Sequence, residues 1–553
     1  MKSNRRAFLS RMSLATAALT IPGFVYPFAC SGDDYVETET THGRIKGIRN
    51  EGVNIFKGIP YAGKISGDRR FRRPAPLAPW TGVRDALQLG APAFQPLNGT
   101  RGLNEPKPNE DCLFLNVWTP ANDNRKRPVM FYNHGGAFVG GSGGAVDQDG
   151  SNLARLFDVV VVETNHRLGI MGFLYLDEIA GVEYAGSGNM GMLDITAGLN
   201  WVNKNIAAFG GDPDNVMIFG ESGGGAKTTC LYAMPEAAPF FNKASIESGP
   251  GIRMIPKEAA AEMTAIVLRE LNISPKEWRK LLEVPAEDLL SLQMKMPALM
   301  AQSDYTKKNG AVGFAPNAFA PVVDGVALPH HPFDPTAPNI SKNKPLMVGW
   351  NEDEYTFFAM ASGDTGALKG DFTFAALPAK LESQFGVNTQ KIIDTYRHTR
   401  PTATASDIWV AIESINMMGL GSIKIAERKV QQQGAPVYLY NFGYKSESKV
   451  PGTDYAFGTP HAMDITFKFN NEVPGSKADF LGGDKPERFA ASHNFAELWT
   501  SFAKTGTPSA KGAPAWQAYN LKDRPTMKID NKLEVINNRY SEETAMWRSI
   551  GKL

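Results

Sequence analysis

A serine flanked by glycines lies near the middle of the chain. Residues 220–224 read GESGG, and they connect a short apolar run, 216–219, to the helix-prone stretch 226–234. A G-x-S-x-G pattern between a strand and a helix is typical of a nucleophile elbow, where small neighbours permit the sharp turn that exposes the hydroxyl. The pattern therefore predicts that Ser222 is a nucleophile for acyl transfer, with the next backbone N–H group free to bind an oxyanion.

A second match to the same pattern, GGSGG at residues 140–144, lies in a different context. It follows a glycine-rich stretch and continues into VDQD at 146–149, without an apolar helix behind it. We therefore interpret Ser142 as part of a loop and not as a nucleophile.

A histidine followed by two glycines, at residues 134–136, comes directly after the apolar run 129–132. In this position an HGG segment is typical of the second half of an oxyanion hole, because glycines let backbone N–H groups approach a developing negative charge. Alone the segment would indicate a turn, but the elbow about 85 residues later makes an oxyanion hole the better interpretation.

The chain has eight histidines, and three of them lie late enough to follow a serine and an acid in the order Ser, Asp/Glu, His. His398 stands among charged residues, and His493 lies within an amphipathic helical pattern. His461 lies in a loop rich in glycine and proline, 457–464. Catalytic bases usually occupy loops held by a rigid scaffold. We therefore expect His461 to be the base.

Three adjacent carboxylates, Glu352, Asp353 and Glu354, follow the strand-like run 346–351. One of them is expected to hold the imidazole tautomer and stabilise the imidazolium ion. As a plain surface cluster they would need no function, and composition does not choose among them.

The elements that must position these residues are strand-like runs separated by helical patterns. The runs are nearly continuous in apolar residues, as in strands buried on both faces: 129–132, 159–162, 216–219, 346–348 and 437–440. Their alternation with helices predicts an α/β protein with a mostly parallel sheet covered on both faces. Residues 256–310 are rich in methionine and in helical patterns, and we expect them to form a cap.

The composition favours one large globular domain, residues 30–553, because no linker tract or fixed-period repeat divides the 553 residues. Lysine and arginine number 58 against 57 acidic residues, without a basic stripe, so nucleic acid is not an expected partner. The three cysteines are too few for a disulfide framework. No cluster has metal-ligand spacing, so we do not expect a metal.

The N-terminal segment, residues 1–29, has the features of an export signal. Arg5-Arg6 precedes an uncharged stretch from 12 to 29, as in a twin-arginine signal. Cys30 follows the alanine at the end of this stretch, as at a bacterial lipoprotein processing site, although Pro27 departs from that pattern. We expect a periplasmic, extracellular or lipid-anchored protein, and ordinary cleavage nearby is the alternative.

Taken together, these segments resemble the type-B carboxylesterase and cholinesterase family from about residue 35 to 545. FKGIPYA at 56–62, EDCLFLNV at 110–117 and FGGDP at 209–213, leading into the elbow, are the motifs that carry the resemblance. It implies an α/β-hydrolase fold and the hydrolysis of carboxylic esters without a cofactor. Carried over position by position, it assigns these roles: Ser222 nucleophile, His461 base, Glu354 acid, and Gly135, Gly136 and Gly223 oxyanion donors.

Several residues depart from the pattern of that family. Gly223 stands where alanine is usual, and Tyr355 replaces the usual glycine after the acid. Phe94 stands where the family has the disulfide partner of Cys112, so the resemblance implies that this bridge is absent. His166 takes the place of a usual tyrosine.

Two alternative functions remain compatible with the fold. A catalytically silent adhesion or scaffold protein can share it, because fold alone does not determine function. Silent relatives lose a triad residue, whereas this chain keeps all three. An amidase or lactonase could also use the same triad.

Overall fold

The computed structural model describes residues 34–96, 105–311, 313–315, 318–476 and 480–553. The predicted export signal and Cys30 lie outside these residues. The described chain forms two units that interleave in sequence. The N-terminal unit contains residues 34–245 and Gly251–Ser341, and the C-terminal unit contains Ile246–Pro250 and Lys342–Leu553. Strand β9 (Lys243–Glu247) carries the chain from the first unit into the second.

The sheet of the N-terminal unit changes from antiparallel to parallel along its strand order. In that order its strands are β1 (Tyr35–Thr40), β2 (Gly43–Asn50), β3 (Val53–Pro60), β5 (Phe114–Thr119), β7 (Val160–Thr164), β6 (Arg127–Asn133) and β8 (Gly211–Glu221). The short β4 (Val83–Asp85) pairs with β2. Pairing is antiparallel from β1 to β7, whereas β7, β6 and β8 are mutually parallel. The predicted nucleophile follows one of these parallel strands.

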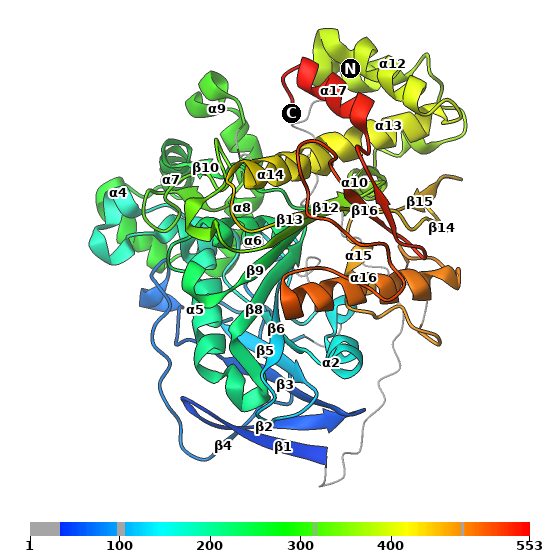
Figure 1. Cartoon of the computed structure of the whole chain (residues 1–553). Coiled ribbons are helices and arrows are strands. Elements are labelled where there is room, and N and C mark those ends of the chain that lie inside the picture. The colour runs from blue at the N-terminus through cyan, green and yellow to red at the C-terminus, as the bar shows by residue number, and fades with distance from the viewer. Residues whose placement is uncertain (1–33, 97–104, 312, 316–317, 477–479) are drawn as a thin grey trace. The chain divides into compact units, whose positions relative to one another are not determined.

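Helices cover both faces of the parallel part of this sheet (Figure 1). Gly150, at the start of α2 (Ser151–Phe157), lies against Val161, whereas Gly198 in α5 (Met190–Asn205) lies against Thr164. Val161 and Thr164 are three positions apart on β7, and side chains alternate between faces along a strand. The two helices therefore pack on opposite faces, which explains why β6 and β7 are buried throughout.

The segment expected to form a cap is helical in the structure. Its helices are α7 (Lys257–Glu270), the 3-10 helix η9 (Pro275–Leu282), α8 (Ala286–Ala301) and α9 (Asp304–Asn309). Gln293 of α8 accepts a hydrogen bond of 2.8 Å from the backbone N–H of Ile170 in α3 (Gly169–Phe173). The helical content is thus confirmed, and the role as a cap stays a prediction.

The C-terminal unit contains a second set of parallel strands. β12 (Leu346–Asn351), β13 (Val437–Phe442) and β16 (Thr526–Ile529) pair in parallel, and β17 (Glu534–Ile536) adds an antiparallel edge. A separate hairpin joins β14 (Ser446–Lys449) and β15 (Ala456–Gly458). The helices of this unit are α10 (Glu354–Ser362), α11 (Leu377–Phe385), α12 (Thr389–Thr399), α13 (Ala405–Ser414), α14 (Leu420–Gln431), α15 (Asp464–Lys468), α16 (Glu487–Thr505) and α17 (Ser541–Ser549).

The strands of the C-terminal unit also have helices on both faces (Figure 1). Tyr440 packs edge-on against Trp499 of α16, with ring centroids 4.9 Å apart. Trp350 faces the other way and meets Gly419, directly before α14. The helical run Ala405–Gln431 is long and apolar enough to cross a membrane, but 72% of its apolar window is buried within the structure. Such burial is typical of a core helix.

Candidate active site

Ser222 occupies a strained turn between β8 and α6 (Gly223–Ala233). Its backbone has φ 58° and ψ −122°, a conformation that residues with a side chain rarely adopt. A Cβ atom at Gly220 or Gly224 would lie 2.5 or 1.9 Å from the carbonyl oxygen of Asn133, so only glycine fits at either position. Ser222 itself is partly exposed among buried neighbours. The local geometry is that of a nucleophile elbow, as the sequence pattern predicts.

The segment 134–137, which we call the oxyanion loop, lies directly against this elbow. A Cβ atom at Gly135 would be 3.7 Å from Cβ of Ser222, so the loop backbone approaches the serine closely. Gly136 and Ala137 both have positive φ, 81° and 52°, as the loop turns. The structure thus brings Gly135 close to Ser222, which Gly223 follows in the chain, and Gly136 comes next along the loop.

Gly223, where the related family usually has alanine, has no room for a side chain here. A Cβ atom at Gly223 would lie 2.2 Å from the carbonyl oxygen of Ala137 and 2.4 Å from its nitrogen. Contacts under 3.0 Å do not occur for real Cβ atoms, so the oxyanion loop occupies the space that an alanine side chain would need. The loop can therefore take this position only because residue 223 is glycine and not the usual alanine.

Lys227 contacts the oxyanion loop from within α6, and the sequence reasoning did not identify it. Its side chain is fully buried, and Nζ donates to the carbonyl oxygens of His134 at 2.8 Å and Gly135 at 3.4 Å. Burial lowers the pKa of Lys227 to about 7. The signal that could have drawn attention to it is a lysine inside an otherwise apolar helix, GGGAKTTCLYA.

Two buried imidazoles stack beside this lysine. The rings of His134 and His166 lie 4.7 Å apart and 11° from parallel. Burial, and then the charge of Lys227, hold the pKa of both histidines well below the ordinary value. In the neutral form Nδ1 of His134 donates to the carbonyl oxygen of Gly135 at 2.9 Å. We therefore interpret both rings as neutral packing groups and not as proton acceptors.

His461 and Glu354 form a buried hydrogen-bonded pair in the C-terminal unit. Nδ1 of His461 lies 2.5 Å from Oε2 of Glu354, and the backbone N–H of Asn351 donates to Oε1 at 2.8 Å. Glu354 is fully buried and His461 is 3% exposed. This contact places the imidazole proton on Nδ1, so that Nε2 is the basic atom. The ring of Phe358 packs against the imidazole, with centroids 4.6 Å apart.

The neighbouring carboxylates face other partners. Glu352 pairs with Lys445 at 2.6 Å and with Arg539, whereas Asp353 pairs with Lys445 at 2.5 Å and accepts from the backbone N–H of Thr459 at 2.8 Å. Burial acts to raise the pKa of Glu352, but the charges of Lys445 and Arg539 outweigh it and lower the pKa. Of the three adjacent acids, Glu354 is the one in contact with the histidine.

The other late histidines lie on exposed helix surfaces. The side chain of His398 is 76% exposed on α12 and that of His493 is 57% exposed on α16. Each lies near one glutamate, Glu542 at 3.5 Å and Glu497 at 3.9 Å. Neither has the buried carboxylate contact that orients His461.

A buried ion cluster lies beside the His461–Glu354 pair, and the sequence reasoning did not identify it. Nζ of Lys468 lies 2.5 Å from Oε2 of Glu247 and 3.0 Å from Oδ2 of Asp464, and all three side chains are fully buried. Trp499 donates to Glu247 at 2.5 Å, and Asn351 donates from its side chain to Asp464 at 3.0 Å. Because Asn351 also donates to the predicted acid, the cluster is connected to the histidine pair.

The second G-x-S-x-G match is a buried loop. Ser142 is 2% exposed, its hydroxyl donates to Glu105, and the N–H of Gly144 donates to the same hydroxyl at 3.3 Å. No helix follows it within the loop, which leads instead into the 3-10 turn Val146–Gln148. The loop interpretation of this segment agrees with the structure.

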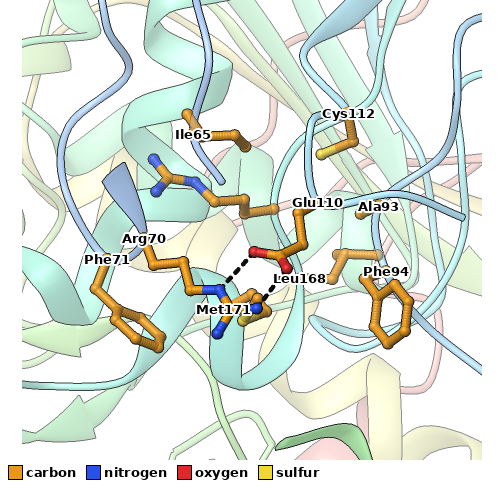
Figure 2. A pocket seen from close by; sticks show the side chains of 10 residues that line it. Ile65, Arg70, Phe71, Ala93, Phe94, Glu110, Cys112, Leu168 and Met171 are labelled. Carbon is orange, nitrogen blue, oxygen red and sulfur yellow. Dashed lines mark hydrogen bonds and ion pairs between the residues drawn. The ribbon is translucent and has the colours of Figure 1, made fainter. Parts of the chain in front are cut away.

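A small cavity lies at Cys112, where the sequence predicts that the disulfide of the family is absent. Cys112 is a free, buried thiol, and Phe94 lies near it on the cavity wall (Figure 2). Arg70 and Glu110 pair across the cavity, with N–O distances of 2.7 and 2.5 Å. The free volume is about 10 Å³, the lower limit for one water molecule. Among the described residues, no group of His, Cys, Asp or Glu side chains is arranged to hold a metal ion.

Comparison with known proteins identifies the family of the chain. A model of the carboxylesterase family matches residues 33–547. The para-nitrobenzyl esterase of Bacillus subtilis is 35% identical over 507 residues, covering 91% of this chain and 96% of that protein. The liver carboxylesterase of Sus scrofa is 31% identical, and the match covers 93% of this chain and 92% of that protein. The solved carboxylesterase structure from Geobacillus stearothermophilus matches with a TM-score of 0.76 and 35% identity, covering 92% of this chain and 99% of that one.

The solved relatives have the α/β-hydrolase fold, so the fold class predicted from the sequence is confirmed. The match extends over nearly the whole described chain, and the relatives are esterases by name. The chain therefore belongs to the carboxylesterase family, the type-B carboxylesterase and cholinesterase group, and is an ester-hydrolysing enzyme.

Proposed function

We propose that the enzyme hydrolyses small carboxylic esters through a Ser222–His461–Glu354 triad and a covalent acyl-enzyme. The observation that carries the proposal is the strained, partly exposed Ser222 with the glycines of the oxyanion loop against it. The buried His461–Glu354 contact of 2.5 Å supports the assignment of base and acid. Nucleophile, base, orienting acid and backbone donors are the parts that acyl transfer requires.

In the proposed mechanism, Oγ of Ser222 attacks the ester carbonyl carbon while Nε2 of His461 accepts the hydroxyl proton. The carbonyl π electrons move to the oxygen, which is stabilised by the N–H groups of Gly135, Gly136 and Gly223, each worth about 3 kcal/mol. Collapse breaks the bond to the alcohol, which leaves with the proton from the imidazolium. Water then repeats the sequence on the acyl-enzyme and releases the acid.

Replacement of the nucleophile tests the proposal. Ser222→Ala should abolish hydrolysis of p-nitrophenyl acetate, because the acyl-enzyme cannot form. Ser142→Ala, the matched change in the second glycine-flanked motif, should retain wild-type turnover. A p-nitrophenyl alkylphosphonate, which loses p-nitrophenolate when the serine oxygen attacks phosphorus, should label wild type and Ser142→Ala at one site, and it should not label Ser222→Ala. Turnover by folded Ser222→Ala, or labelling of Ser142, would overturn the assignment.

We also propose that residues 1–29 direct export through a twin-arginine signal and that Cys30 carries a lipid anchor. The paired Arg5-Arg6 before an uncharged stretch supports the first part, and the position of Cys30 supports the second. Arg5-Arg6→Lys-Lys should block export, and Cys30→Ser should release an exported enzyme from membranes. Unchanged export of the first variant and soluble wild-type enzyme would contradict the respective parts.

A further inference from the structure

Lys227 is a buried cation held by backbone carbonyl groups. Its Nζ donates to the carbonyl oxygen of His134 at 2.8 Å and approaches that of Gly135 at 3.4 Å. Among the residues that the structure describes, no carboxylate lies within ion-pair distance of Lys227, and burial alone accounts for its shifted pKa. The positive charge is therefore directed at the backbone of the oxyanion loop.

These two carbonyl groups belong to the peptide units that supply the oxyanion donors. The carbonyl of His134 and the N–H of Gly135 form one planar peptide group, and the carbonyl of Gly135 and the N–H of Gly136 form the next. In a trans peptide the carbonyl and N–H bonds point in opposite directions. A cation that fixes the carbonyl end therefore fixes the direction of the N–H end, which would otherwise rotate about the flexible glycines.

The charge also polarises the same peptide groups. A hydrogen bond to the carbonyl oxygen makes the N–H of that peptide a stronger donor, and such polarisation is larger in a low-dielectric interior. Lys227 and both peptide units lie in such an interior, since His134 is 2% exposed and Lys227 is fully buried. The other groups beside the amine are the neutral rings of His134 and His166 and the ring of Phe138, 6.0 Å away.

A carboxylate also lies close to the loop, at the same end of the parallel strands β6 and β8. Oε2 of Glu221 lies 3.3 Å from the position that a Cβ atom of Gly135 would take. Glu221 directly precedes the nucleophile on β8, whereas Lys227 is five residues beyond it on α6. An acidic and a basic side chain therefore both lie close to the loop backbone, and the basic one contacts the carbonyl oxygens.

We propose that Lys227 is a positioning residue of the oxyanion hole, which orients and polarises the N–H groups of Gly135 and Gly136 through their partner carbonyls. The inference rests on the proposed function and adds a charged group that acts through the backbone. Its contribution is largest when negative charge develops on the carbonyl oxygen of the substrate, so it belongs to kcat and not to substrate binding.

Neutral replacements of Lys227 measure this contribution. Lys227→Met removes charge and donor, and kcat should fall roughly 10- to 100-fold with KM nearly unchanged, less than the loss of a whole oxyanion donor. Lys227→Gln keeps a hydrogen-bond donor without the charge, and its kcat should lie between those of Lys227→Met and wild type. Affinity for a trifluoromethyl ketone, whose hemiketal oxyanion occupies the hole, should fall in parallel with kcat. Affinity for the matching alcohol, which cannot form a hemiketal, should stay unchanged.

Lys429→Met is the matched control, because Lys429 is also a buried lysine that donates to a backbone carbonyl, that of Lys342, at 2.6 Å. It lies on α14, away from the oxyanion loop in sequence, and should lose stability without losing kcat. If Lys227→Met and Lys429→Met lose stability alike and both keep wild-type kcat, Lys227 is a structural residue and the proposal is wrong.

The pH profile gives a second readout that does not depend on a folded methionine variant. Wild-type kcat should decline as pH rises through the pKa of Lys227, about 7, and level off near the value of Lys227→Gln. Lys227→Gln should lack this decline. The proposal is wrong if wild type and Lys227→Gln show the same pH dependence, both in kcat and in their affinity for the trifluoromethyl ketone. Inactive Ser222→Ala in the same assay separates this failure from failure of the triad.

Discussion

Two fully buried lysines, one in each unit of the chain, have different surroundings. Lys468, in the C-terminal unit, lies between the carboxylates of Glu247 and Asp464 at 2.5 and 3.0 Å. Lys227, in the N-terminal unit, contacts backbone carbonyls and has its pKa lowered by burial. One charge is neutralised where it lies, whereas the other is left to act on the peptide groups around it.

The difference separates support of a fold from support of a reaction. A buried ion pair with complete hydrogen bonding roughly offsets its own desolvation, so it contributes geometry more than free energy. A buried cation without a carboxylate has no counter-charge to offset its desolvation, and its field acts on the peptide groups that it contacts. The comparison predicts that changes near Lys468 alter stability, and that changes near Lys227 alter the rate.

The largest expected effect tests the acid that completes the C-terminal part of the site. Glu354→Gln should lower kcat on the order of 10⁴-fold, because an amide in this position favours the wrong imidazole tautomer. Asp353→Asn and Glu352→Gln are matched changes in the same run, and their partners are Lys445, Arg539 and Thr459. They should change kcat by less than about 10-fold. A crippled Asp353→Asn beside an active Glu354→Gln would show that the acid is misassigned.

The next effect separates the two lysines. Lys468→Met leaves Glu247 and Asp464 buried without their cation, which should lower the free energy of unfolding by about 3–5 kcal/mol. The loss should grow with rising pH, because each uncompensated carboxylate must then be buried as an anion. Urea unfolding measures the loss, and kcat of the folded fraction should stay within about 10-fold of wild type.

Removal of all three charges is the control for this cluster. The triple variant Lys468→Met, Glu247→Gln, Asp464→Asn should recover most of the stability, because a neutral buried network avoids the unpaired anions. A Lys468→Met enzyme that keeps its stability and loses its rate would reverse the distinction between the two lysines.

The pH dependence of stability follows from the pKa of Lys227. Folding lowers this pKa from an unfolded value near 10.4 to about 7, so below pH 7 both states bind the proton and stability does not change with pH. Between pH 7 and 10 only the unfolded state stays protonated, so the folded state gains stability as pH rises. Relative to Lys227→Met, wild type should gain about 2–3 kcal/mol from pH 7 to 9.

Urea unfolding of both proteins at pH 7, 8 and 9 checks this difference. Parallel stability curves would mean that the Lys227 amine titrates alike in the folded and unfolded states, which is incompatible with an uncompensated buried cation.

The sequence predicted the regular parts of this enzyme well. The five strand-like runs coincide with β6, β7, β8, β12 and β13, apart from residue 159, which directly precedes β7, because a strand buried on both faces must be apolar along its length. The elbow and the oxyanion loop were also accessible, since a strained turn requires glycine at fixed offsets from Ser222. Cys112 was expected to lack its disulfide partner, and it is a free thiol.

The contacts between distant side chains could not be predicted from the sequence in the same way. Glu352, Asp353 and Glu354 have the same chemistry, and only the turn after β12 directs the third toward His461. Lys227 and Lys468 stand in apolar segments. The carbonyl partners of Lys227 lie 92 and 93 residues away, and Lys468 pairs with Asp464 four residues away but also with Glu247, which is 221 residues away. The antiparallel pairing of β5 with β3 and with β7 likewise depends on long-range contacts that periodicity does not encode.

The smallest effect concerns the space between the elbow and the oxyanion loop. Gly223→Ala places a Cβ atom 2.2 Å from the carbonyl oxygen of Ala137, so the loop must shift to relieve the overlap. A shift of this size misdirects the N–H groups that face the oxyanion, and kcat should fall roughly 10-fold, less than the loss of a whole donor.

Because the overlap is with the backbone of Ala137, truncation of the Ala137 side chain cannot relieve it, and Gly223→Ala with Ala137→Gly should be no more active than Gly223→Ala. Gly366→Ala is the control, since a Cβ atom there meets nothing within 4 Å. If the loop is held by Lys227, Gly223→Ala and Lys227→Gln act on the same peptide groups, and their losses should not add. Strict additivity of the two losses in kcat would show that Gly223 and Lys227 act on the reaction independently.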